Sequence, residues 1–150
     1  MPIPSLISAN VLICEKILRE ADGVISVIRL VDLFYFTLRE GTPPEQQAVV
    51  VTFLATGKFN PQDISQHLIQ LRLVRTNDEA VDLGEPIPFI LSDVETQIPG
   101  VPRGFNIIAQ APIIPKQTGG TCYIVLVVDG EEVARTPFTL AERPAPDTKG

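Results

Sequence analysis

The chain of 150 residues has few of the side chains on which most enzymes depend. It contains no tryptophan, one histidine (His67), two cysteines and only 6% aromatic residues. One histidine does not make a zinc site, because such sites take three or four nitrogen, sulfur or oxygen ligands. No serine lies in a G-x-S-x-G nucleophile elbow, so a hydrolase triad at His67 is not indicated. We therefore expect a protein that is not an enzyme, without catalytic residues, cofactors or a metal site.

Positive charge is scarce in the second half of the chain. Residues 76–150 hold 5 basic and 11 acidic side chains, which accounts for the whole net charge of −6. Because an acidic surface repels phosphate, we expect binding to neither nucleic acid nor anionic membranes.

No targeting or membrane-spanning segment is visible in the sequence. The apolar stretch from Ile3 to Cys14 contains Ser5, Ser8 and Asn10 and has no basic residues before it, unlike a secretory signal. We expect a cytoplasmic protein that does not insert into membranes.

Branched aliphatic residues dominate what the chain does contain. Isoleucine and valine together number 31, against 24 for leucine and alanine, and none of the 14 prolines interrupts a helical pattern. Side chains branched at Cβ fit a pleated sheet better than a helix. The composition predicts an all-β fold, and the length is typical of one domain.

Strand and turn signals alternate along the chain and predict about eight strands. Asp22-Gly23 and Asp129-Gly130 are dipeptides typical of tight hairpin turns. Residues 6–18 fit either a helix or a strand. The other expected strand regions are 24–36, 47–55, 67–75, a short return at 80–83, 89–91, 105–111, 121–128 and 132–140.

The segment 67–75 alternates between apolar and polar side chains, which is typical of a strand with one face in the core. Gln70 and Arg72 are expected to face water, and His67 is interpreted as an exposed or edge residue at the strand start. The residues expected to face the core are Ile69, Leu71 and Leu73.

The runs 49–54 and 124–128 are apolar on both faces, so both of their faces should be covered. Either loops from the proline-rich stretch 86–115 or another protein subunit could cover them. The second alternative points to self-association or a protein partner.

The remaining reactive residues have simpler interpretations than catalysis. Cys14 and Cys122 are expected to be free, buried thiols, although a disulfide between two strands stays open. Gly119-Gly120 lacks the following Lys-Ser/Thr of a phosphate-binding loop and is interpreted as a turn. The acidic clusters are interpreted as solvated turn residues, with calcium binding as the alternative; they are Asp78, Glu79, Asp82, Asp93, Glu95, Asp129, Glu131 and Glu132.

Two sets of strand-and-turn motifs resemble an uncharacterised bacterial family of small β-sandwich proteins, catalogued as a domain of unknown function. The N-terminal set is residues 9–15 (ANVLICE) and 22–28 (DGVISVI). The C-terminal set is residues 120–123 (GTCY), 129–131 (DGE) and 135–138 (RTPF). The resemblance covers roughly the first 140 residues. It implies an immunoglobulin-like or C2-like antiparallel β-sandwich and no known activity.

These observations combine into one expectation for the whole chain. Residues 1–140 should form a single β-sandwich domain, and residues 141–150, which contain Pro144 and Pro146, a flexible tail. The expected function is a non-catalytic protein-interaction or assembly module, as a homo-oligomer. The alternative is a β-sandwich that binds a small ligand, either carbohydrate or calcium.

Overall fold

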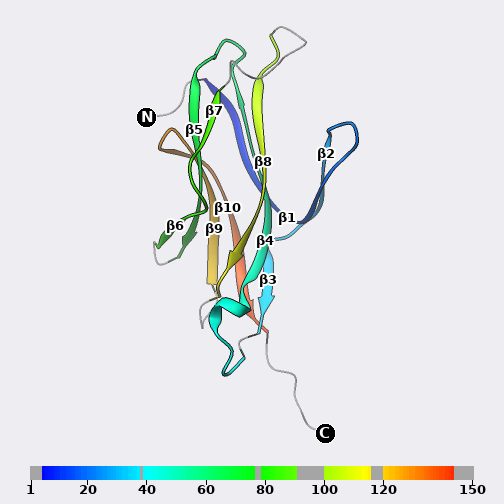
Figure 1. The fold of residues 1–150 in the computed structure, drawn as a ribbon, viewed down its shortest axis with the longest axis vertical. Helices are drawn as coiled ribbons and strands as arrows, with labels where there is room; N and C mark the ends of the chain where they lie inside the picture. Colours follow the sequence, from blue (N-terminus) through cyan, green and yellow to red (C-terminus); the bar gives the residue numbers. More distant parts are fainter. Residues whose placement is uncertain (1–4, 38, 77–78, 91–99, 116–119, 144–150) are drawn as a thin grey trace.

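The protein is an all-β sandwich in the computed structural model, which describes residues 5–37, 39–76, 79–90, 100–115 and 120–143 (Figure 1). These residues form ten strands and one short 3-10 helix, η1 (Pro44–Gln47). The strands are β1 (Leu6–Arg19), β2 (Ile25–Leu30), β3 (Leu33–Phe36), β4 (Val49–Phe59), β5 (Gln66–Arg75), β6 (Ala80–Asp82), β7 (Ile87–Ile90), β8 (Arg103–Ile113), β9 (Gly120–Val128) and β10 (Glu131–Glu142).

The strands form two sheets that pack face to face. Sheet A has the order β2-β1-β4-β8, and sheet B has the order β3-β10-β9-β5-β6, with β7 also paired to β5. The order β10-β9-β5 matches strands G, F and C of an immunoglobulin sandwich, and β1-β4-β8 matches strands A, B and E. The expected sandwich is therefore confirmed.

Two details differ from the sequence-based expectation. One pair of strands, β3 and β10, is parallel, so the sandwich is not wholly antiparallel. The count is ten strands among the described residues, because one segment expected as a single strand divides. Val24–Phe36 divides at Val31 and Asp32, between the end of β2 at Leu30 and the start of β3 at Leu33. As a result β2 belongs to sheet A and β3 to sheet B.

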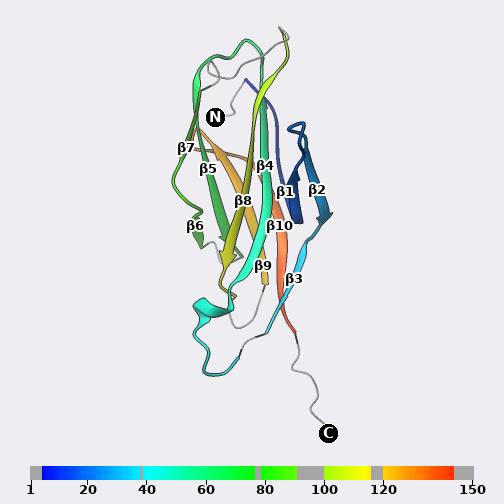
Figure 2. The same cartoon turned by 45° about the vertical axis from the view of Figure 1, so that its right-hand side comes forward.

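The N-terminal segment is a strand, which decides between the two alternatives left open for residues 6–18. β1 pairs with β4 over its first half and with β2 over its second half. In both views the β1–β2 hairpin leans away from the sandwich (Figures 1 and 2).

β4 continues beyond the expected turn at Thr56 and ends at Phe59. Gly57 permits this, because a Cβ atom built on it would lie 2.5 Å from the Phe105 ring. The glycine thus marks a close approach between strands, where the sequence had suggested the end of one.

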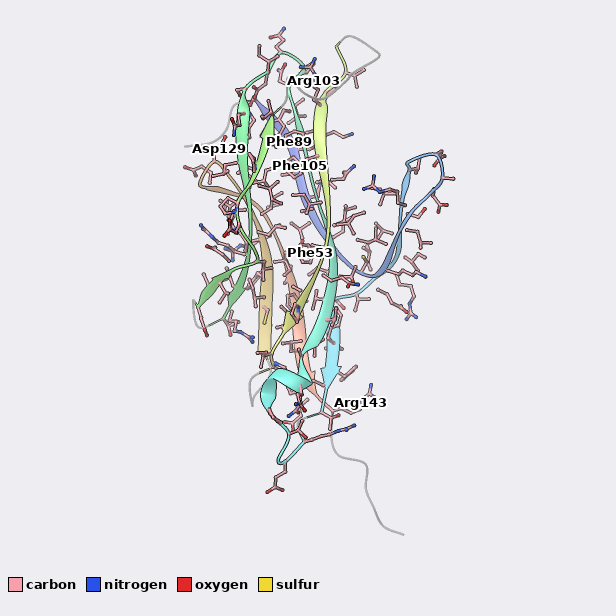
Figure 3. All side chains as sticks on the ribbon, in the orientation of Figure 1. Phe53, Phe89, Arg103, Phe105, Asp129 and Arg143 are labelled. Carbon is pink, nitrogen blue, oxygen red and sulfur yellow. The ribbon has the colours of Figure 1, made fainter. Side chains whose placement is uncertain are left out.

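Aromatic and branched aliphatic side chains fill the space between the sheets. Among the largest fully buried side chains are Phe53, Phe59, Phe138, Ile124 and Leu126. Figure 3 shows Phe89 and Phe105 together in the upper half of the sandwich, the half in which Asp129 also lies.

The core face of β5 is as expected, since Ile69, Leu71 and Leu73 are all buried. The expectation that Gln70 faces water is wrong, because its side chain is buried. Its Nε2 donates hydrogen bonds to the carbonyl oxygens of Leu71 and Gly84, each at 3.0 Å. The segment that leads into β7 therefore covers the outward side of β5 at this point.

The last strand extends two residues beyond the expected domain boundary at residue 140 and ends at Glu142. Ala141 and Glu142 belong to β10 and pair with Tyr35 and Phe36. Residues 144–150, the rest of the expected tail, lie outside the described residues. In the part of the chain that is described, no helix is long and apolar enough to cross a membrane.

Candidate functional site

His67 lies at the centre of a buried polar cluster at the start of β5. Its Nε2 lies 2.8 Å from Oδ2 of Asp63, and its Nδ1 lies 2.5 Å from Oδ2 of Asp129. Ser65 Oγ lies 3.2 Å from Nε2 and also contacts Oδ1 of Asp63 at 2.5 Å. Three separate segments thus meet at one imidazole: the β4–β5 turn, β5 and the β9–β10 turn.

The ring of Phe59 covers the inner side of the cluster. Phe59 stacks on the imidazole with ring centroids 4.3 Å apart and an interplanar angle of 15°. His67 is buried, so its interpretation as an exposed residue is wrong. The alternation of β5 explains this, because His67 shares a face with Ile69 and the core.

Asp129 is held in place from two sides. Its Oδ1 accepts a hydrogen bond from the Leu68 N–H at 2.8 Å, and its own N–H donates to the Leu68 carbonyl at 2.8 Å. Its φ of 51° is the left-handed conformation that a tight hairpin turn requires. Asp129 therefore has two roles, because it forms the hairpin turn with Gly130 and its carboxylate binds His67.

The charges in the cluster stabilise one another. Burial alone would lower the pKa of His67, but the hydrogen bonds that its ring donates to Asp129 and Asp63, together with the negative charges of these carboxylates, outweigh it and raise the pKa. Burial would also raise the pKa of Asp63, but hydrogen bonds from Ser5, Ser65 and His67 outweigh it and lower the pKa well below the usual range. Both effects favour an imidazolium between two carboxylates.

This arrangement does not suit catalysis. A histidine acts as a general base only when one ring nitrogen is free to accept a proton, and here both nitrogens face carboxylates. Ser65 is therefore not activated in the way of a serine nucleophile. Within the described ranges, no group of three or more histidine, cysteine or acidic residues could hold a metal ion. The cluster joins the β4–β5 turn and the β9–β10 turn to β5 through one imidazole.

The two cysteines are buried and are not joined in a disulfide, as expected. Burial raises the pKa of the Cys14 thiol, although a backbone hydrogen bond from Lys16 opposes this. Its Sγ donates to the carbonyl oxygen of Thr52 at 3.8 Å. A protonated, buried thiol is a poor nucleophile.

The acidic candidates do not come together as a calcium site in the described structure. Asp82 pairs with Arg72, Asp129 with His67, and Glu132 with Arg135. Glu79 is exposed and accepts from the Arg75 N–H through its backbone carbonyl. Glu131 is partly buried and begins β10, where it pairs with Val128. Asp78, Asp93 and Glu95 lie outside the described residues, as does Gly119, whereas Gly120 begins β9.

The outer face of sheet B is covered by its own side chains. Val125 and Val127 point outward from β9 but are only 2% and 3% exposed. Val125 lies between Arg72 and Arg135 in the register, and Val127 lies between Gln70 and Glu132. Long side chains on a neighbouring strand can cover apolar surface with their stems. The apolar run 124–128 is therefore buried within the single chain, without a second subunit to cover it.

The outer face of sheet A is different, because apolar side chains remain exposed there. Leu12, Leu54 and Ile108 form one row across β1, β4 and β8. Leu30 lies opposite Cys14 in the next row, and Val50 lies further along β4. Leu30 is 69% exposed, Val50 55%, Ile108 39% and Leu12 36%, whereas Leu54, between Leu12 and Ile108, is buried. We call these five residues, Leu12, Leu30, Val50, Leu54 and Ile108, the apolar face.

The sequence alone did not identify this surface or the partners of His67. The run 49–54 pointed to β4, but Leu12, Leu30 and Ile108 join it only through strand pairing. Asp63 and Ser65 precede His67 by four and two residues, a local pattern that could have placed them beside the imidazole.

Comparisons with known proteins identify no family. No protein-family model matches the chain, and no curated protein matches it. Among solved structures, the alkylpurine DNA glycosylase AlkC of Pseudomonas fluorescens, bound to DNA containing an abasic site analog, is similar with a TM-score of 0.46 and 11% sequence identity. The match covers 73% of this chain and 28% of that protein, so the chain spans less than a third of its length. A likeness of this degree says nothing about function.

Proposed function

We propose that the chain is a non-catalytic protein-interaction or assembly module that acts through sheet A and associates with itself. The observation that supports this most is the contrast between the two outer faces. Sheet B carries the ion pairs Arg72–Asp82 and Arg135–Glu132, whereas sheet A exposes the apolar side chains of Leu12, Leu30, Val50 and Ile108 and carries its ion pair, Arg29–Glu15, on the β1–β2 hairpin. Exposed apolar side chains gathered on one face mark interaction sites in soluble proteins.

The other features of the molecule fit this proposal. The one histidine is engaged on both ring nitrogens, which supports a role outside catalysis. Cysteines that are not joined in a disulfide are typical of a reducing compartment, which supports a cytoplasmic location. Binding of a carbohydrate or calcium has less support, because Asp82 and Asp129 are paired with basic groups and no tryptophan is present to stack on a sugar ring.

The proposal predicts that a charge on sheet A weakens self-association. Ile108→Lys would put an ammonium group on the apolar face, and burying it in an interface is unfavourable. We expect the dissociation constant of the oligomer to rise at least tenfold, as measured by sedimentation velocity over a concentration series.

Leu68→Lys is the matched control, because Leu68 is 46% exposed but lies on sheet B. It should leave the dissociation constant unchanged. A wild-type chain that stays monomeric at high concentration would contradict the proposed self-association, and so would equal effects of the two substitutions.

A further inference from the structure

One edge of sheet A is open along a whole strand. β8 pairs with β4 from Arg103 to Ile113 without a register shift, and no described strand pairs with its other edge. In an immunoglobulin sandwich, strand D occupies this position next to strand E. The open edge of β8 is visible in Figure 2, where β8 crosses in front of the sandwich.

β8 has little of the protection that edge strands usually carry. Natural edges are kept short, bulged or charged, or carry proline, so that they do not pair with other chains. β8 is 11 residues long and unbulged, and its protective residues, Arg103 and Pro112, lie near its two ends. An edge of this kind is a ready template for another strand.

The proline in β8 indicates which backbone groups point to the open edge. Successive residues of a strand direct their N–H and C=O groups to opposite sides, and Pro112 has no N–H to donate. Proline is tolerated in a strand where its nitrogen faces away from the neighbouring strand. Gly104, Asn106, Ile108 and Gln110 share this side with Pro112, so their backbone groups are available at the edge.

We propose that two copies of the chain associate by antiparallel pairing of β8 with β8, around a twofold axis at Ile108, so that the two A sheets form one continuous sheet. This inference rests on the proposed function and names its partner as a second copy. Ile108 then lies opposite Ile108 of the second copy, and Asn106 lies opposite Gln110 of the second copy.

The sequence of β8 is self-complementary in this register. On the outer side, the amides of Asn106 and Gln110 can hydrogen-bond across the pair, next to the two isoleucines. On the inner side, large residues meet small ones: Ile107 lies opposite Ala109, and Phe105 lies opposite Ala111. Strand pairing by itself needs only backbone groups, but this pattern selects one register.

The gap beside β8 supports the same arrangement. A groove of about 410 Å³ lies between β8 and the segment that follows β6, and apolar side chains dominate its walls. They include Phe53, Leu71, Leu83, Ala109 and Ala111. The inner side chains of a second β8 would lie over this groove and remove its apolar lining from water.

Disulfide cross-linking tests the register directly. Hydrogen-bonded antiparallel residues have Cα atoms about 5.5 Å apart, which is within disulfide range. Under mild oxidation, Ile108→Cys should therefore give a covalent dimer. Asn106→Cys should not, because its two copies would lie about 13 Å apart along the strands. The native cysteines are buried and do not interfere.

Gln110→Pro and Gln110→Ala test the edge itself. Both remove the amide side chain, but only proline also removes the N–H that points to the second copy. We expect proline to raise the dissociation constant at least tenfold more than alanine does, with circular dichroism showing that both variants are folded. Leu68→Lys lies on sheet B, away from the open edge of β8, and should not change the constant.

The outcomes separate this inference from the proposed function. If the wild-type chain associates but Val50→Lys disrupts the oligomer and Gln110→Pro does not, the copies stack face to face and the edge pairing is wrong. Equal cross-linking by Ile108→Cys and Asn106→Cys, or none by either, would also overturn it. A strictly monomeric wild-type chain would overturn both.

Discussion

At the scale of single residues, His67 shows how one side chain can join distant parts of a fold. The imidazole connects Asp63 in the β4–β5 turn to Asp129 in the β9–β10 turn, 62 residues away along the chain from His67. Removing one partner of a buried ion pair leaves the other charges uncompensated, which costs more than the pair itself contributes.

The substitution His67→Phe keeps an aromatic ring stacked on Phe59 but removes the positive charge of the imidazolium. We expect the free energy of unfolding in urea to fall by about 3 kcal/mol at pH 6. Glu15→Gln breaks an exposed ion pair with Arg29 and should cost at most about 1 kcal/mol.

The same cluster sets a pH dependence whose sign follows from the two pKa shifts. The pKa of His67 is raised above 6.5, so its contribution to stability is complete below pH 6.5 and is lost as the pH rises through the raised pKa. The pKa of Asp63 is lowered below 3.8, so its contribution is present above pH 3.8 and is lost as the pH falls through the lowered pKa. Stability should decline from pH 6 to pH 9 in the wild type, and His67→Phe should flatten this decline. A slope that is the same in both proteins would show that His67 is not its source.

At the scale of strands, most of the fold could be predicted, because patterning and turn chemistry are local. The alternation of β5 and the hairpin at Asp129-Gly130 were both readable from neighbouring residues. The division of residues 24–36 was not, because the partners of β2 and β3 lie in different sheets. The end of β4 was also misplaced at residue 55, since the Phe105 ring that Gly57 accommodates is 48 residues away and cannot be inferred from neighbouring residues.

The substitution Gly57→Ala tests the close approach between β4 and β8 at Phe105. The added methyl group would overlap the Phe105 ring, so we expect a loss of about 2 kcal/mol in the free energy of unfolding. Phe105→Leu in the same chain should recover part of this loss, because the smaller side chain leaves room. A double-mutant cycle measures the coupling, and strictly additive effects would count against the contact.

At the scale of the whole molecule, charge opposes the association that apolar surface favours. Each copy carries a net charge of −6, so two copies repel each other in dilute salt. The candidate interface could not be predicted from the sequence, because strand pairing gathers its residues from β1, β2, β4 and β8. The resemblance to an uncharacterised bacterial family likewise stays a prediction.

Self-association should therefore tighten as salt rises. Between about 20 and 300 mM NaCl the Debye length falls several-fold, which screens the repulsion between copies. We expect the dissociation constant measured by sedimentation to fall by a few-fold over this range. A dissociation constant that rises with salt would instead indicate that opposite charges hold the copies together.

The parallel pairing of β3 with β10 has a consequence for how the chain is made. Thr139–Glu142 pair with Leu33–Phe36, so β3 has no partner strand in sheet B until β10 is in place. Contacts this far apart in sequence slow folding, and a growing chain on the ribosome cannot form them until its final strand has emerged. Until then both β3 and β9 present unpaired edges. Prematurely terminated chains would stay open in the same way and would be favoured substrates for chaperones and proteases.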